Sequence, residues 1–374
     1  MRKAIVSLLA IVLGLLAGAL LMALTGHDPI EGYRYLISGG LKNRERIGNT
    51  LATATPLIFT GLSLAFSFRT GLFNIGAPGQ MLFGGFCATA VGLTFDLPRA
   101  LLLIVMILAG FIGGALWAFI PGILKAKFNV HEVVSTIMMN WSCYWIVYYG
   151  VPAYFKGPSL ETESRLLPDK ASLKTPFMTD LFNGSYVNLG LILAIVAVIV
   201  VGFIINKTTL GYELKAVGFN RDAAEYAGIA VNRGIITSML ISGGLAGLGG
   251  VAQYAGNASN IQIGLLPSQG FDGIAVALLG ASAPVGVLLS AIFFGILYSG
   301  RGFMNAMTDI PPEIADTIIA IIIYFAATSV LFERLISWLK KRRGGKAEQP
   351  GNPPKPDEPV SQAEEVKNVG RVGE

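Results

Sequence analysis

Charged residues are scarce in this 374-residue sequence. Asp, Glu, Lys and Arg make up 14% of it, whereas hydrophobic residues make up 53% and the mean hydropathy is +0.61. Soluble globular domains carry about 25% charged residues, so the composition argues against a water-soluble fold. Glycine is abundant instead, with 46 residues, and glycine lets membrane helices approach one another closely. The composition predicts an all-α, polytopic helical membrane protein.

Cysteine, histidine and nucleotide-binding motifs are also lacking. Cys87 and Cys143 lie inside apolar runs, which indicates no disulfide framework. His27 and His131 are too few for a metal cluster, so we expect no metal and no cofactor. The Gly-Lys pair at 345–346 lacks the glycine spacing and the hydroxyl residue of a phosphate-binding loop. The sequence therefore predicts a protein that is not an enzyme and does not by itself bind a nucleotide phosphate in the P-loop manner.

Nine stretches free of charge are candidates for crossing a bilayer, which takes about 20 mainly apolar residues. They are 4–26, 47–68, 70–95, 100–124, 133–155, 181–206, 234–271, 273–300 and 317–332. The stretch 234–271 is too long for one helix, and 273–300 is interrupted just before Pro284. We expect these two stretches to hold three or four segments, some of them short or broken. The total is about ten transmembrane helices.

The basic residues predict the orientation. Lys and Arg favour the cytoplasmic side of a membrane, and they precede the first apolar stretch (Arg2 and Lys3) and follow the last (340–343). Both termini are therefore expected in the cytoplasm, with an even number of crossings of the cell membrane. Ten crossings give the inner segments 125–132 and 207–233 and the outer segments 27–46 and 154–187. Because most of the basic residues lie at the ends of apolar runs, the net charge of +5 does not indicate nucleic-acid binding.

Two parts of the chain differ in character. Residues 1–343 form the predicted transmembrane domain, whereas 344–374 is rich in proline and charge. The second part cannot bury enough apolar area to offset its ordering entropy, so we predict a disordered cytoplasmic tail. Ion-coupled carriers usually bury ionisable residues in mid-membrane. The apolar runs here are almost free of them, which favours a conduit that is passive or powered from outside.

A glycine-rich stretch at 71–80 interrupts the apolar pattern. Pro78 removes a backbone donor, so a helix must break or begin there. Freed carbonyls at membrane depth are tolerated where they line a cavity or are buried in protein. Asn74 and Gln80 flank the break, which makes them candidates for a substrate path. A tight cytoplasmic turn with a capping asparagine is an equally good interpretation.

Three further amides, Asn140, Gln253 and Asn257, are isolated in apolar runs. Each is better interpreted as forming a hydrogen bond between helices than as contacting a ligand. We nevertheless keep Asn140, together with Asp272 near a segment end, as candidate residues of the substrate path. Glycine pairs spaced four apart (14/18, 110/114 and 243/247) predict close helix crossings.

The predicted inner loop 207–233 contains a short amphipathic helix. Asn220 can cap it, Asp222 lies in its first turn, and Gly228 can end it. Its apolar face is small and rich in alanine, which suits docking into a groove on a soluble partner better than resting on lipid headgroups. The candidate contact residues are Asn220, Asp222, Ala223, Ala224, Glu225 and Gly228.

Three ordered motifs lie at 49–80, 216–229 and 270–280. The first contains the run Gly71-Leu72-Phe73-Asn74-Ile75-Gly76 and the last begins Gly270-Phe271-Asp272-Gly273. Together they resemble the permease subunits of ATP-binding-cassette (ABC) importers, in the nucleoside-type branch that is related to ribose and branched-chain amino-acid permeases. The second motif is similar to the loop by which that family contacts its ATPase. Pro78 is a departure, because the nucleoside-type pattern usually has Glu there.

The resemblance implies a nucleoside importer with several partners. These are cytoplasmic ABC ATPase subunits, a second permease that is the same or a different chain, and an extracytoplasmic substrate-binding lipoprotein. The shared motifs serve architecture as much as specificity, so a ribose-type sugar permease is a same-class alternative. An ion-coupled secondary transporter is an alternative from another class.

Overall fold

The computed structural model describes residues 2–157 and 162–328, which belong to one compact unit, Met1–Ser329. Over these ranges the regular structure is helical, apart from two isolated bridges that pair Lys156 with Ser164 and Glu163 with Gln262. The all-α class is therefore confirmed. The predicted tail, 344–374, and the basic cluster at 340–343 lie outside the described residues.

The helices follow the order predicted from the apolar stretches. They are α1 (Arg2–Leu24), α2 (Pro29–Leu41), α3 (Arg44–Arg69), α4 (Ala77–Thr94), α5 (Arg99–Phe128), α6 (Glu132–Tyr154), α7 (Pro176–Leu181), α8 (Gly190–Lys207), α9 (Thr209–Phe219), α10 (Arg221–Tyr226), α11 (Val231–Val251), α12 (Ser268–Leu279), α13 (Pro284–Thr308) and α14 (Pro312–Ala327). A 3₁₀ turn, η1, covers Asp169–Ala171, and a π-helix, η2, covers Ala252–Ala258.

Six described helical stretches are long and apolar enough to cross a bilayer. They are Ser7–Leu24, Arg44–Arg69, Arg99–Phe128, Gly190–Lys207, Val231–Ala258 and Pro284–Thr308. This number is below the expected ten, because α4 carries glycines, Pro78 and Gln80, α6 carries Asn140 and several Trp and Tyr residues, and α12 has only 12 residues. The chain is a multi-pass membrane protein, and the number of its crossings stays a prediction.

The long apolar region after residue 233 is divided into three helices, as expected. α11 continues as η2, residues 259–267 are irregular, and α12 follows. α12 ends at Leu279, with Gly280 as its C-cap, and α13 begins at Pro284. Between them Ala281 and Ser282 have φ angles of 51° and 52°. Proline can begin α13 without losing a helical hydrogen bond, because the first N–H groups of a helix have no partner within it.

Glycine sets the helix spacing where α4, α5 and α11 cross. A Cβ on Gly114 would lie 2.2 Å from the carbonyl oxygen of Gly243, and a Cβ on Gly247 would lie 2.2 Å from that of Gly110. No side chain fits at such distances, so the predicted close crossings are confirmed for these two pairs. The pair in α1 faces side chains of α14, because a Cβ on Gly14 would lie 2.2 Å from Ile322 Cγ1 and one on Gly18 would lie 2.5 Å from Ile318 Cγ1.

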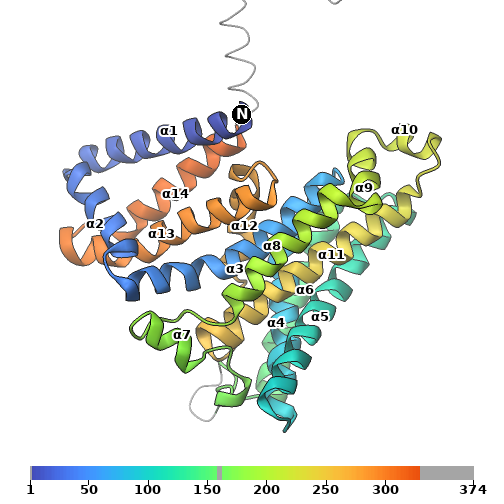
Figure 1. Ribbon diagram of the computed structural model, residues 1–374, viewed down its shortest axis with the longest axis horizontal. Helices are drawn as coiled ribbons and strands as arrows, with labels where there is room; N and C mark the ends of the chain where they lie inside the picture. Colours follow the sequence, from blue (N-terminus) through green and yellow to red (C-terminus); the bar gives the residue numbers. More distant parts are fainter. Residues whose placement is uncertain (1, 158–161, 329–374) are drawn as a thin grey trace, which may run out of the picture. The chain divides into compact units, whose positions relative to one another are not determined.

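Different connecting segments lie at the two ends of α8. Figure 1 shows α9 and α10 at one end and α7 at the other. Arg221 of α10 donates a 3.4 Å hydrogen bond to Asn129 Oδ1 in the turn between α5 and α6. The segments 125–132 and 207–233 therefore lie at the same end of the helices. This agrees with their assignment to one side of the membrane.

Candidate functional site

Two of the predicted path residues lie at the buried turn between α3 and α4, Asn74 within the turn and Gln80 in the first turn of α4. Asn74 Nδ2 donates to Gln80 Oε1 (3.0 Å) and to Ser242 Oγ on α11 (2.9 Å). Asn74 Oδ1 accepts from the Gly76 backbone N–H (2.9 Å) and from Gln80 Nε2 (3.2 Å). The two amides thus bond to each other in both directions and close the turn, and α4 begins at Ala77, so the predicted break is confirmed.

Asn140 of α6 holds the same turn from the opposite side. Its Oδ1 accepts from the Gly79 N–H at 2.9 Å, and its Nδ2 donates to the Ile75 carbonyl oxygen at 2.9 Å. The prediction that Asn140 forms a hydrogen bond between helices is confirmed. Pro78 is buried against α12, where a Cβ on Gly270 would lie 2.4 Å from Pro78 Cα.

The hydrogen-bonding groups of these three amides are therefore occupied by the protein itself. The exposed fractions of Asn74, Gln80 and Asn140 are 0%, 1% and 2%. None of the three lines the polar cavity described next. Their contacts favour the interpretation as a turn held by amides, and their role in a substrate path stays a prediction.

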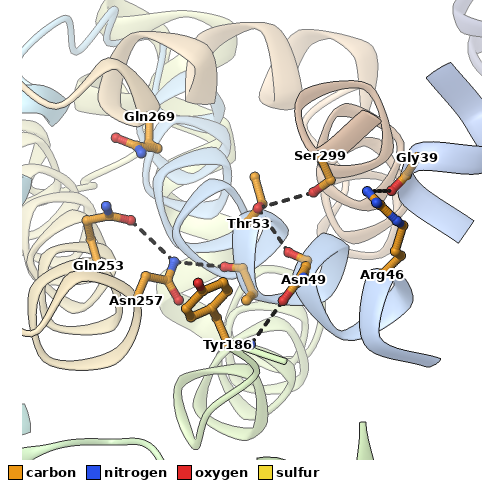
Figure 2. A pocket seen from close by; sticks show the side chains of 10 residues that line it. Gly39, Arg46, Asn49, Thr53, Tyr186, Gln253, Asn257, Gln269 and Ser299 are labelled. Carbon is orange, nitrogen blue, oxygen red and sulfur yellow. Dashed lines mark hydrogen bonds between the residues drawn. The ribbon is translucent and has the colours of Figure 1, made fainter. Parts of the chain in front are cut away.

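A polar cavity of about 400 Å³ lies between α3, η2, α12 and α13 (Figure 2). Its lining consists of Gly39, Arg46, Asn49, Ala52, Thr53, Tyr186, Gln253, Asn257, Gln269 and Ser299. The volume is within the range of about 300–1,000 Å³ that is common for small-molecule sites. Apart from Arg46, the polar side chains are amides, hydroxyls and a phenol. The cavity therefore suits a neutral ligand with several hydrogen-bonding groups.

Two walls of the cavity are joined through α3. Thr53 Oγ1 donates to the Asn49 carbonyl oxygen at 2.9 Å and accepts from Ser299 Oγ of α13 at 3.3 Å. Asn49 Oδ1 accepts from the Tyr186 N–H at 3.0 Å. The guanidinium group of Arg46 is engaged within the protein, because it donates to the Gly39 carbonyl oxygen at 3.3 Å and lies over the Phe303 ring of α13.

The π-helix η2 supplies the opposite wall. Its wider turn is of a kind often found at functional sites, and Gln253 and Asn257 both line the cavity from it. Asn257 Nδ2 donates to the Ala52 carbonyl oxygen at 3.0 Å and to Gln253 Oε1 at 3.3 Å. Asn257 Oδ1 accepts from Asn188 Nδ2 at 3.0 Å, which fixes the orientation of the amide.

Several donors and acceptors in the cavity remain free for a ligand. Across the part of the chain that the structure describes, the Gln269 carboxamide makes no hydrogen bond, although its backbone oxygen accepts from Thr60 Oγ1 at 2.9 Å. The Nδ2 of Asn49 and the Nε2 of Gln253 likewise have no acceptor among the described residues. Three carboxamides can thus form hydrogen bonds with a ligand in this cavity.

Sequence reasoning found part of this site. Gln253 and Asn257 were interpreted as bonding between helices, which Asn257 does, and both also line the cavity. Asn49, Thr53 and Gln269 were not proposed as site residues. One signal was available: Asn49 and Thr53 are spaced four apart, as Gln253 and Asn257 are, and side chains with that spacing share a helix face.

Asp272 lies one turn after Gln269 on α12 and does not line the cavity. Its half-buried carboxylate lies near the hydroxyl groups of Tyr298 and Ser268. Arg301 is paired with Asp316 of α14 at 2.8 Å. The role of Asp272 in a substrate path stays a prediction.

The short helix predicted in the loop 207–233 is present as α10. Asn220 caps it, with Oδ1 accepting from the Ala223 N–H at 3.0 Å, and Asp222 lies in its first turn. Gly228 follows its end with a φ of 82°. The preceding helix, α9, was missed, although Thr208 caps it in the same way by accepting from the N–H of residue 211 at 3.2 Å.

The structure divides the predicted contact residues of this loop into two groups. Ala224 is buried, with 4% of its surface exposed, and packs with Val217 and Val231. Its side chain therefore supports the loop and is not available to a partner. Ala223 and Glu225 are exposed, and the neighbouring Tyr226 is 98% exposed.

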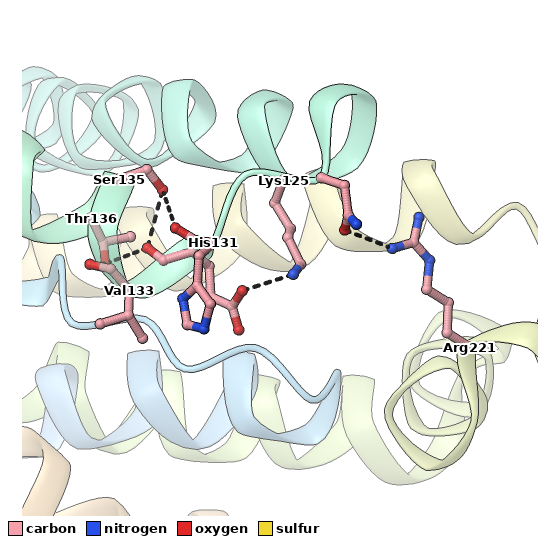
Figure 3. A network of polar contacts seen from close by, with 8 residues as sticks. Lys125, His131, Val133, Ser135, Thr136 and Arg221 are labelled. Carbon is pink, nitrogen blue, oxygen red and sulfur yellow. Dashed lines mark hydrogen bonds and ion pairs between the residues drawn. The ribbon is translucent and has the colours of Figure 1, made fainter.

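An ion pair orders the turn on which α10 rests (Figure 3). Lys125 Nζ lies 2.9 Å from the Glu132 carboxylate, and Thr136 Oγ1 donates to the Glu132 carbonyl oxygen at 2.7 Å. Burial alone would raise the pKa of Glu132, but the hydrogen bonds and the charge of Lys125 outweigh it and lower that pKa. The α5–α6 turn is thus a fixed surface beneath the loop.

Comparison with known proteins gives the family. Residues 46–327 match the family described as branched-chain amino acid transport system / permease component. The chain is 43% identical over 339 residues to the guanosine ABC transporter permease protein NupP of Bacillus subtilis, covering 90% of this chain and 97% of the relative. It is 40% identical over 352 residues to the nucleoside ABC transporter permease protein NupB of Lactococcus lactis (92% and 96%).

A more distant relative is the glucose ABC transporter permease protein TsgB13 of Haloferax volcanii, which is 31% identical over 338 residues (87% of each chain). No solved structure matches the chain. The match covers both the buried turn at 71–80 and the loop containing α10. The chain therefore belongs to this family of ABC transporter permeases, whose members are membrane-spanning transporter subunits and not enzymes.

Proposed function

We propose that this chain is the permease subunit of an ABC importer that takes up nucleosides. The observation that carries the proposal is the cavity of about 400 Å³, lined mainly by neutral amides and hydroxyls inside an apolar helical bundle, with Arg46 as the one charged residue among the described residues that line it. The names of its relatives NupP and NupB agree with this substrate class. A nucleoside is neutral, so its binding leaves no unpaired charge of its own buried in the cavity, which would be costly.

The chemistry of the cavity fits both parts of a nucleoside. A nucleobase edge and a ribose ring each present donors and acceptors, and a carboxamide can satisfy either kind. Gln253, Gln269 and Asn49 supply such groups. Tyr186 is 57% exposed and lines the cavity, and the side of its ring that Lys174 does not cover offers a stacking surface for a base.

The proposed topology has ten crossings. They are α1, α3, α4, α5, α6, α8, α11 with η2, the segment 259–279 that contains α12, α13 and α14. The cavity then opens to the outside, because Gly39 and Arg46 belong to the predicted outer segment 27–46 and Tyr186 belongs to 154–187. Substrate delivered by an extracytoplasmic binding lipoprotein would meet this side first.

The inner end is proposed to meet the ATPase subunits. In this proposal α10 presents Ala223, Glu225 and Tyr226, all of them exposed, to a groove on the ATPase. Asn220 and Asp222 order the helix itself. A second permease subunit completes the membrane-spanning part of the complex.

A sugar importer is the second candidate, because TsgB13 is named for glucose. A sugar has no aromatic base, so uptake of a sugar should not depend on a stacking ring in the same way. An ion-coupled carrier is disfavoured because the described residues that line the cavity include no Asp, Glu, Lys or His, whereas carriers of that kind usually use buried ionisable residues.

The test is uptake by the complete complex in cells that lack other nucleoside uptake. Labelled guanosine and uridine should enter in an ATP-dependent manner, and unlabelled nucleosides should compete where ribose and glucose do not. Uptake that survives ATP depletion but stops with a protonophore would contradict an ABC importer. Competition by a sugar alone would support the second candidate.

Reporter fusions test the topology separately. Fusions at Lys3 and after Gly344 should both give the cytoplasmic signal if the number of crossings is even. Opposite signals from the two ends would contradict ten crossings without bearing on the substrate.

A further inference from the structure

One face of α6 exposes aromatic side chains from the middle of the helix towards its C-terminal end. The exposed fractions are 52% for Trp141, 50% for Trp145, 37% for Tyr148 and 67% for Tyr149. The rings of Trp145, Tyr148 and Tyr149 contact one another, and the Trp145 and Tyr149 rings stack with centroids 5.9 Å apart. We call Trp141, Trp145, Tyr148 and Tyr149 the α6 aromatic face. α6 is also not one of the helices apolar enough to qualify as a span by composition.

Other exposed helix faces have a different composition. α5 exposes Ile104, Leu108 and Ile112, and α8 exposes Ile195, Ile199 and Val200, with exposed fractions between 43% and 66%. Such aliphatic faces suit lipid acyl chains, which offer no hydrogen bonds. Trp and Tyr facing lipid gather at the membrane–water interfaces. Trp141 and Trp145 of the α6 aromatic face instead flank the middle of this 23-residue helix, so an interfacial belt does not account for the face.

We propose that the α6 aromatic face is the surface on which the second permease subunit packs. A shallow apolar groove of about 500 Å³ lies on it, lined by Phe86 of α4 and by Trp145, Tyr149 and Tyr154. A side chain projecting from the partner can fill this groove, and a partner helix can hydrogen-bond the tyrosine hydroxyls, which acyl chains cannot. This proposal rests on the proposed function only in requiring a second permease subunit.

The exposed area is a large part of what a stable interface needs. A Trp or Tyr side chain buries roughly 150–250 Å² when fully covered. At the exposed fractions of the α6 aromatic face, covering its four rings would bury about 400 Å² on this subunit. A standard interface buries about 800 Å² per partner, and the neighbouring Met138 and Ile146, 59% and 44% exposed, extend the same surface. This single helix therefore supplies at least half of the area required.

Site-specific photocrosslinking tests the proposal in membranes that contain the complete complex. The photoreactive residue p-benzoylphenylalanine replaces Tyr149 in one strain and Ile199 of α8 in a control strain. We expect irradiation at position 149 to give a product with the mass of two permease subunits, whose linked peptide maps to a membrane helix of a permease. Position 199 should give at least tenfold less of it. Equal yields, or an adduct at 149 with lipid, the ATPase or the binding protein alone, would overturn the proposal.

Substitutions provide a second measurement. The double variant Trp145→Ala with Tyr149→Ala should reduce the fraction of paired permeases on native gels, whereas Ile195→Ala with Ile199→Ala should not. A pair unaffected by the first variant would contradict the interface. ATP-dependent nucleoside uptake without a crosslink would leave the proposed function intact, and a crosslink without nucleoside uptake would leave the interface intact.

Discussion

Asn257 Nδ2 donates a hydrogen bond of 3.0 Å to the carbonyl oxygen of Ala52. This bond joins η2 to α3 at a point where both residues line the polar cavity. The same amide accepts from Asn188 at the start of α8. Three helical segments that are distant in the sequence therefore depend on one side chain, so the shape of the cavity and the packing of the bundle are coupled here.

Gln269 and Asn257 should respond differently to the same substitution. Gln269→Leu removes a carboxamide with no intramolecular hydrogen bond, so the melting temperature should stay unchanged while KM for nucleosides rises about 2- to 10-fold, the value of one neutral hydrogen bond. Asn257→Leu should also lower the melting temperature. Uptake kinetics and thermal unfolding of the purified complex measure the two effects. Asn206→Leu on α8, away from the cavity, is the matched control, and an unchanged KM in Gln269→Leu would remove that residue from the site.

Substitution of the buried amides at the α3–α4 turn distinguishes a structural role from a role in the substrate path. Asn140→Leu leaves the Gly79 N–H and the Ile75 carbonyl without partners, each at a cost of about 1–3 kcal/mol. We expect a lower melting temperature and less assembled complex, with normal uptake per assembled complex, and the same for Asn74→Leu. A variant that melts like the wild type but takes up no nucleoside would instead support the substrate path.

Gly247 should tolerate no side chain. The Cβ of Gly247→Ala would lie 2.2 Å from the Gly110 carbonyl oxygen, so α5 and α11 must separate and the yield of folded protein should fall. Gly302→Ala on α13 is the control, because no atom lies within 4 Å of the added Cβ and alanine favours a helix by roughly 0.5–1 kcal/mol. Equal melting temperatures for the two variants would contradict the close crossing.

Substitutions in the α10 loop should distinguish residues that contact the ATPase from residues that stabilise the loop itself. Tyr226→Ala removes a side chain that is 98% exposed, so we expect normal folding with substrate-stimulated ATP hydrolysis reduced several-fold. Ala224→Asp places a charge in a buried position and should destabilise the loop itself. Gly228→Arg forces a side chain into a positive φ of 82°, at about 1–2 kcal/mol. Normal coupling in Tyr226→Ala would argue against this surface.

The Lys125–Glu132 ion pair predicts a pH dependence of stability. The folded state lowers the pKa of Glu132, so the stabilisation is complete above the unfolded pKa of about 4.3 and is lost as the pH falls through the folded value. The difference in melting temperature between the wild type and Glu132→Gln should therefore be constant from about pH 5 to 8 and shrink below about pH 4.3. A difference that grows on acidification would contradict the sign of the shift.

Local chemistry was predicted well because it needs only neighbours in the sequence. Asn220 caps α10 through a group three residues away, and Pro284 begins α13 where the apolar pattern is interrupted. Glycines spaced four apart predicted close crossings, since that spacing places them on one helix face. The sequence did not indicate which helices cross, because the Gly110 pair meets the Gly243 pair across more than a hundred residues.

The sequence by itself determined the membrane class, the order of the segments, the break before α4 and the capped helix α10, since composition, periodicity and capping act over a few residues. Only the tertiary structure decided which polar residues are available to a ligand. Asn74 and Asn140 each form hydrogen bonds to backbone groups at the turn. Asn49 and Gln269, in contrast, line one cavity although 220 positions separate them in the sequence. An amide in an apolar run must find a partner, and helix packing determines whether that partner is the protein or a substrate.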